Sequence, residues 1–108
     1  MATATFLPAF SYPVVGYAYD ITGCTENGTS ANSITCGGIA PDFNVNGILV
    51  VDCSTKSAGA ATPLAAYASV DTDSIVNNAN SAQTVVFDLY VFSTGGAGVD
   101  TTVRILVY

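Results

Sequence analysis

Charge is scarce in this sequence, and histidine and tryptophan are absent. Charged residues make up 9% of the chain, whereas soluble domains average about 25%. The basic residues are Lys56 and Arg104, and with eight acids they give a formal net charge of −6. Binding to a phosphate backbone needs several lysines or arginines, and an anionic membrane repels an acidic protein. We therefore expect no direct binding to nucleic acid or to membranes.

Catalytic and metal-binding side chains are poorly represented as well. Without histidine the chain lacks the commonest general base, and no spacing of its aspartates singles out a pair of the kind that glycosidases use. The segment Asp71-x-Asp73 offers oxygen ligands, but Ile75 and a missing glycine depart from the EF-hand calcium loop. We predict a protein that is not an enzyme and that has no cofactor and no metal site.

The cysteines are few and odd in number. Cys24, Cys36 and Cys53 form no CxxC pair, which argues against a zinc or thioredoxin-type site. The favoured interpretation is that they are small buried hydrophobic side chains. The alternative is a disulfide between Cys24 and Cys36, which would indicate an oxidising environment.

Apolar residues make up 50% of the chain, and they are spread in short runs. No run approaches the roughly 20 residues that span a bilayer. Instead, β-branched and aromatic residues alternate between turn-forming residues, as is typical of strands. This pattern predicts strands at residues 14–21, 48–53, 64–70, 84–93 and 101–108.

These strands predict an all-β fold, as a single small antiparallel β-sandwich or jelly-roll-like barrel with long loops. The 108 residues form one domain, 1–108, with residues 1–13 as an extended N-terminal arm. Residues 22–46 are predicted to be a long loop, with or without short edge strands, and residues 71–83 to be a short helix or turns. The last two strands are predicted to form an antiparallel hairpin in which Asp88 can meet Arg104.

The strands at 48–53 and 84–93 are apolar on both faces, although a sandwich covers only one face of each sheet. A second copy or another protein is therefore expected to cover the remaining face. The arm at 1–13 either crosses to a neighbouring subunit or packs on its own sheet. Tyrosine and phenylalanine serve cores, protein interfaces and sugar platforms alike. For a protein interface we predict Phe6, Leu7, Phe10, Tyr12, Tyr90, Phe92 and Tyr108.

Four stretches carry a family resemblance: the arm MATATFLPAFSYP, the turn-rich TENGTSANSITCGG, and the strands TVVFDLYVFS and TTVRILVY. Together they resemble small virion structural proteins, most of all phage head decoration (cement) proteins. The resemblance lies in composition and strand pattern rather than in a motif, so it supplies no site residues. It implies a homo-oligomer, often a trimer, that binds a major capsid protein at symmetry axes and braces the shell.

The resemblance also implies location in the virion after synthesis in the host cytoplasm. The N-terminal stretch lacks the pattern of a secretory leader, so we expect no signal peptide. Two other functions remain open. One is an extracellular pilus-like or surface-layer subunit, completed by a strand from its neighbour. The other is a small carbohydrate-binding module.

Overall fold

The computed structural model describes residues 2–8, 16–56, 65–78, 82–94 and 100–108. Within these ranges the chain forms β-strands and no α-helix. The strands are β1 (Thr3–Phe6), β2 (Tyr17–Thr22), β3 (Asn32–Ile39), β4 (Ile48–Lys56), β5 (Ala66–Asn78), β6 (Gln83–Ser93) and β7 (Asp100–Val107).

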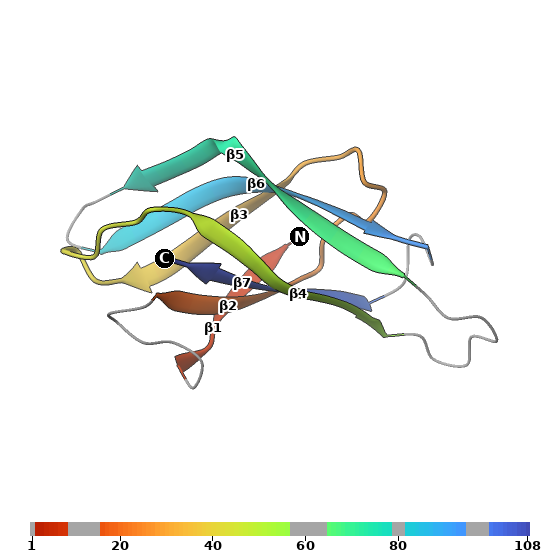
Figure 1. Cartoon of the computed structure of the whole chain (residues 1–108), viewed down its shortest axis with the longest axis horizontal. Helices are drawn as coiled ribbons and strands as arrows, with labels where there is room; N and C mark the ends of the chain where they lie inside the picture. Colours follow the sequence, from red (N-terminus) through yellow and green to blue (C-terminus); the bar gives the residue numbers. More distant parts are fainter. Residues whose placement is uncertain (1, 9–15, 57–64, 79–81, 95–99) are drawn as a thin grey trace.

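The strands form two sheets, a four-stranded sheet in the order β1-β2-β7-β4 and a three-stranded sheet in the order β3-β6-β5. Every pairing between these strands is antiparallel. In Figure 1, β5 and β6 run along the upper part of the view, while β1 and β2 run along the lower part. The all-β antiparallel sandwich predicted from the sequence is confirmed, and its jelly-roll form stays a prediction.

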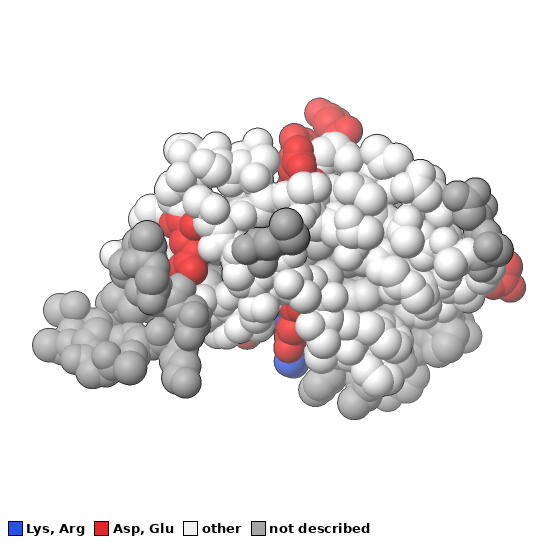
Figure 2. Space-filling model, turned by 180° about the vertical axis from the view of Figure 1, so that it is seen from behind, with Lys and Arg blue, Asp and Glu red and all other residues white. Residues whose placement is uncertain are grey.

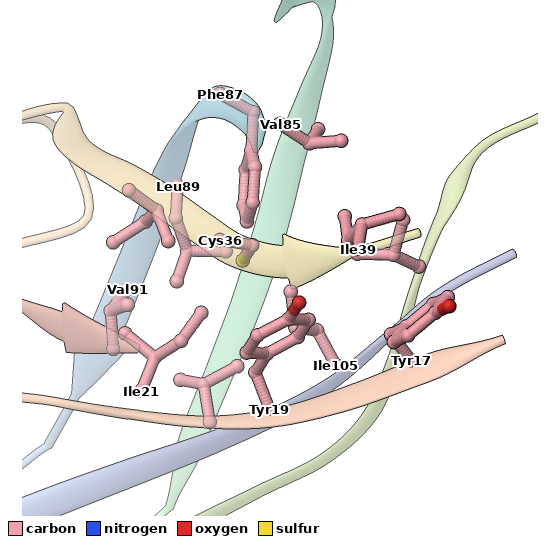
Figure 3. Close-up of a cluster of buried hydrophobic side chains, with 13 residues drawn as sticks. Tyr17, Tyr19, Ile21, Cys36, Ile39, Val85, Phe87, Leu89, Val91 and Ile105 are labelled. Carbon is pink, nitrogen blue, oxygen red and sulfur yellow. The ribbon is translucent and has the colours of Figure 1, made fainter. Parts of the chain in front are cut away.

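The core lies between the two sheets and follows from the period of two in the strands. In β6 every second side chain is buried, and Val85, Phe87, Leu89 and Val91 are at most 1% exposed. Figure 3 shows these side chains pointing toward residues of β2, β3 and β7. The residues that meet them include Tyr17, Tyr19, Ile21, Ile34, Cys36, Ile39, Val103, Ile105 and Val107.

The two buried tyrosines of β2 also tie the sheets together. The hydroxyl of Tyr19 donates a hydrogen bond to the carbonyl of Gly37 in β3. The hydroxyl of Tyr17 accepts one from the amide of Ala40, at 3.2 Å. A buried tyrosine usually finds such a partner for its hydroxyl, because an unpaired one is costly. These bonds therefore fix β2 against the end of β3.

The predicted short helix at residues 71–83 is wrong over the described part, because β5 continues to Asn78. The turn signals at Asp71 and Asp73 are absorbed by an irregularity in the pairing of β5 with β6, which spans Asp71 to Val76. There the amide of Asp73 donates to the Asp71 carboxylate at 3.2 Å, and the Ser74 hydroxyl donates to the Asp71 carbonyl at 2.6 Å. Such a bulge lets a strand pass through residues that favour turns.

The predicted hairpin of the last two strands is also wrong. Strand β6 pairs with β3 and β5, whereas β7 pairs with β2 and β4 in the other sheet. Each strand buries one predominantly apolar face, and placing the strands in opposite sheets lets both faces contribute to the shared core. As a consequence Arg104 does not meet Asp88. It forms an ion pair with Asp20 on the neighbouring strand β2.

Two further segments are settled in part. The predicted loop at 22–46 contains β3, an eight-residue strand at the edge of its sheet, so the alternative with an edge strand is the correct one. In the N-terminal arm, Thr3–Phe6 pairs with β2 of its own sheet, whereas residues 9–13 lie outside the described residues.

Gly16 allows β2 and β7 to approach each other closely. A Cβ atom at this position would collide with the backbone carbonyl oxygen of Val107 and lie 3.0 Å from Leu106 Cδ1. We expect Gly16→Ala to lower the free energy of unfolding by about 1–3 kcal/mol, because a backbone atom cannot move away as a side chain can. Urea unfolding measures this change.

The control is Gly37→Ala, because the nearest atom to a Cβ there is Thr84 Cγ2 at 3.9 Å. This variant is expected to unfold at nearly the same urea concentration as the parent. Equal losses in the two variants would contradict the role of Gly16.

Candidate functional site

Both outer sheet faces carry large apolar side chains that the fold leaves in solvent. Among the described residues, the exposed large hydrophobic side chains are Phe6, Leu49, Val51, Tyr67, Val76 and Tyr108, which are 40 to 61% exposed. Acidic groups are scattered between them, and Figure 2 shows one face of the molecule on which uncharged surface predominates. The candidate functional sites are therefore the outer faces of the two sheets.

An apolar row crosses the outer face of the four-stranded sheet. Leu7 follows β1, and its amide donates to the carbonyl of Ala18 in β2 at 2.8 Å. Ala18 is paired with Leu106 in β7, and Leu106 is paired with Leu49 in β4. We call these four residues the apolar row. Because cross-strand partners share one face of a sheet, their side chains lie next to one another.

A hollow lies beside the apolar row. Its volume is about 390 Å³, and it is lined by Ala18, Val51, Arg104 and Leu106. The pairing of β4 with β7 shifts between Val50 and Asp52, and this bulge places Val51 on the surface with 55% of its side chain exposed. An apolar group of a partner would find apolar walls in the hollow and one basic side chain.

A charged row runs parallel to the apolar row, one step along the strands. Asp20, Arg104 and Asp52 are paired in register on β2, β7 and β4. The Nε and Nη2 atoms of Arg104 donate to the two carboxylate oxygens of Asp20 at 2.8 and 3.1 Å. The hydrogen bond to Asp20, followed by the charges of Asp20 and Asp52, raises the pKa of Arg104. The guanidinium is therefore held in place at the edge of the hollow.

Three aromatic side chains gather on the outer face of the three-stranded sheet, and we call them the aromatic corner. Tyr67 of β5 and Phe92 of β6 are register partners, and their rings stack at 5.2 Å with 29° between the planes. Tyr90 is the next outward residue of β6. Phe92 also has Gly28 against it, where a Cβ atom would lie 3.4 Å from the Phe92 ring.

An acidic pair lies beyond Tyr90 on the same face. Asp71 of β5 is directly opposite Asp88 of β6. Like charges in directly opposed positions destabilise a sheet. The strands β3, β5 and β6 contain no lysine or arginine, so no base within this sheet offsets the pair. This face therefore has acidic character.

The predicted interface residues are distributed over both faces. Tyr90 and Phe92 belong to the aromatic corner, Leu7 belongs to the apolar row, and Tyr108 is an exposed side chain that follows β7. Phe6 is partly exposed, and its ring contacts those of Tyr17 and Tyr19 at centroid distances of 5.9 and 5.7 Å. Phe10 and Tyr12 lie outside the described residues.

Sequence reasoning did not select Leu49, Val51 and Tyr67, which are among the most exposed apolar side chains. The signal for the first two was present, because ILVVDC is apolar on both faces. What was missing was the bulge in β4, which brings Val51 to the surface. Tyr67 lies in a strand of small residues with a weak sequence signal, and only its pairing with Phe92 identifies it as part of an aromatic surface.

The cysteines are free thiols, so the structure does not contain the disulfide between Cys24 and Cys36. Cys36 is fully buried in the core, and its burial raises its pKa to about 12. Burial, then the charges of Glu26 and Cys53, raise the pKa of Cys24 to about 11. The pKa of Cys53 is raised too, mainly by burial. These thiols behave as small apolar side chains at neutral pH.

No cluster of metal-ligating side chains is present in the part of the chain that the structure describes. No helix there has the length and hydrophobicity needed to cross a membrane. Comparison of the chain with protein-family models, with curated proteins and with solved structures gave no match.

Proposed function

We propose that this chain is a structural protein of a virus particle, a capsid decoration subunit that binds and stabilises a symmetric shell through apolar interfaces. Its partners in this proposal are further copies of the chain, as in a trimer, and a major capsid protein. The observation that carries the proposal is the apolar row with its hollow, which runs from Leu7 after β1 through β2 and β7 to β4. At its β4 end the side chains of Leu49 and Val51 are exposed to solvent.

The composition of this face supports contact with protein. Cores of protein interfaces are poor in charged residues and bounded by polar ones. On the four-stranded sheet the apolar row is followed by the charged row, and then by hydroxyl groups such as Thr22 of β2 and Thr102 of β7. Covering the row and the hollow would remove from water the exposed part of Leu49, which is 52%, and of Val51, which is 55%.

The fold supports a mechanical role in which binding is repeated around a shell. Backbone pairing and the shared core hold every strand of the sandwich, so the face is presented as a rigid surface and little order is lost on binding. Copies arranged around a symmetry axis gain avidity because each bound contact raises the effective concentration of the next one. Weak single contacts can then sum to a stable coat.

Leu49→Asp tests the proposed interface. A carboxylate at the β4 end of the apolar row is expected to weaken self-association or binding to the shell by about 30-fold or more, because a buried unpaired charge costs about 2 kcal/mol or more. Light scattering behind a sizing column gives the native mass, and co-sedimentation with capsids gives shell binding.

Thr22→Asp is the matched control. It adds the same charge to the same sheet at an exposed position outside the apolar row, and it is expected to assemble like the parent. A parent chain that is a stable monomer and does not sediment with capsids would contradict the proposal. Normal assembly and normal shell binding by Leu49→Asp would contradict the assignment of the interface to this face.

A further inference from the structure

We propose that the outer face of the three-stranded sheet binds an extended, arginine-bearing segment of a partner protein. The guanidinium groups stack on the aromatic corner and pair with Asp71 and Asp88. This inference rests on the proposed function because it takes the bound molecule to be a protein partner of a structural subunit. It uses a different sheet face from the apolar row.

The first support is the state of the aromatic corner. Tyr67 is 61% exposed, yet its ring is already ordered by the stack on Phe92 at 5.2 Å. Phe92 also packs against the segment around Gly28, whose amide donates to the carbonyl of Val91 at 2.8 Å. A flat aromatic surface that is fixed before binding loses little side-chain freedom when a planar cation stacks on it.

The second support is charge. Asp71 and Asp88 face each other across two strands of a sheet that has no lysine or arginine in its strands. The amide of Asp88 is held by the Ser74 hydroxyl at 2.8 Å, and the same hydroxyl donates to the carbonyl of Asp71. The backbone that carries the pair is thereby fixed, and its mutual repulsion persists in the free protein. A cationic partner offsets that repulsion, whereas an acidic or neutral one does not.

The third support is spacing. Outward positions follow one another along β6 as Phe92, Tyr90 and Asp88, and along β5 as Tyr67, Ser69 and Asp71, each register-paired with its neighbour. Successive outward residues of a strand are about 7 Å apart. Basic residues at alternate positions of an extended segment have the same repeat. One guanidinium can then lie on the ring of Tyr67 while the next lies over Tyr90 and reaches the acidic pair.

Arginine fits this surface better than lysine. The guanidinium is planar, is more weakly hydrated than an ammonium group, and stacks on aromatic faces while its edge donates to a carboxylate. The ammonium group of lysine is a compact charge that satisfies the carboxylates but gains less from the rings. The surface therefore predicts a preference between two peptides of equal charge.

The test uses three peptides, acetyl-Gly-Arg-Gly-Arg-Gly-amide and its counterparts with lysine or glutamine in place of arginine. Each is titrated into the folded protein at low salt while the aromatic NMR signals of Tyr67 and Tyr90 are followed. The arginine peptide is expected to bind about two- to tenfold tighter than the lysine peptide. The glutamine peptide is expected to leave the signals unchanged.

Two variants and one control assign the binding to this face. Tyr67→Ser removes an exposed ring and is expected to abolish the preference for arginine, and Asp71→Asn is expected to weaken both cationic peptides. Asp52→Asn makes the same change in net charge on the other sheet and is expected to bind like the parent. The unfolding midpoint of each variant shows that the fold is retained.

Three results would overturn the inference: equal binding of the arginine and lysine peptides, binding that survives Tyr67→Ser unchanged, or no shift of these signals with any peptide. Shifts caused by an oligosaccharide alone would instead assign the corner to sugar binding. The Leu49→Asp experiment is independent. If the arginine peptide binds as expected but assembly does not depend on Leu49, the proposed interface is wrong and the arginine site stands. If assembly depends on Leu49 but the arginine peptide does not bind as expected, the arginine site is wrong and the interface stands.

Discussion

Replacing Phe87 by alanine is expected to lower the free energy of unfolding by about 3–5 kcal/mol, the usual loss for a fully buried phenylalanine. Phe87 is 1% exposed and lies in the middle of β6. Its ring is among the largest buried side chains of the cluster shared by both sheets. The loss combines apolar surface returned to water with a cavity that neighbours on opposing strands cannot fill.

Urea unfolding at neutral pH measures the effect. Phe87→Leu removes less volume and is expected to lose clearly less stability, which keeps the comparison informative if the alanine variant does not fold. Phe6→Ala is the matched control, because Phe6 is 40% exposed and stands on an edge strand. If Phe6→Ala were as costly as Phe87→Ala, the core would not lie where the structure places it.

Alkaline pH is expected to lower the free energy of unfolding. Burial raises the pKa of Cys36 from an ordinary value of 9.0 to about 12. Burial also raises the pKa of Tyr19 above its ordinary value of 10.0. At a pH between the ordinary pKa of such a group and its raised pKa in the folded protein, the unfolded chain has released a proton that the folded chain retains. Rising pH therefore favours unfolding.

The sign and range follow from Cys36. Below about pH 8 the thiol is protonated in both states and contributes no pH dependence, whereas each pH unit above 9 costs up to about 1.4 kcal/mol until the folded pKa is reached. Cys24, whose pKa is raised to about 11, and Cys53, whose pKa is also raised, add to the slope above pH 9, and Tyr19 adds to it above pH 10. Urea unfolding in reductant at intervals from pH 7 to 11 gives the profile.

Cys36→Ala separates the thiol from the tyrosine. The variant is less stable at every pH because it leaves a small cavity, but its stability is expected to fall less steeply between pH 9 and 10 than that of the parent. The same slope in both proteins would show that Cys36 does not set the alkaline limit.

The two proposals place two different partners on two different surfaces of this small domain. The apolar row and the aromatic corner lie on the outer faces of different sheets, and the core between them is rigid. The proposed coat function uses the first face, and the arginine site uses the second.

Local patterns are sufficient for most of the strands. The alternation in TVVFDLYVFS determines β6, because a period of two buries Val85, Phe87 and Leu89 together. The chain end TTVRILVY determines β7 in the same way. The excess of apolar residues on the second face of ILVVDC also indicates, from the sequence alone, that a sheet face remains uncovered.

Pairing between strands is decided only by the tertiary structure. A sequence pattern gives the period of a strand but not its neighbour, so the pattern predicts a hairpin of β6 and β7 although they lie in opposite sheets. The same limit explains why Arg104 meets Asp20 and not Asp88.

Long-range pairing also overrides local preference. Residues 71–78 carry turn and helix signals, yet pairing with β6 keeps them in β5, and a bulge takes up the misfit. The sequence by itself determined that the chain is an all-β domain with too little charge to cover its apolar faces. Only the tertiary structure decided which residues share a face, because cross-strand neighbours are set by the packing of two sheets around one core.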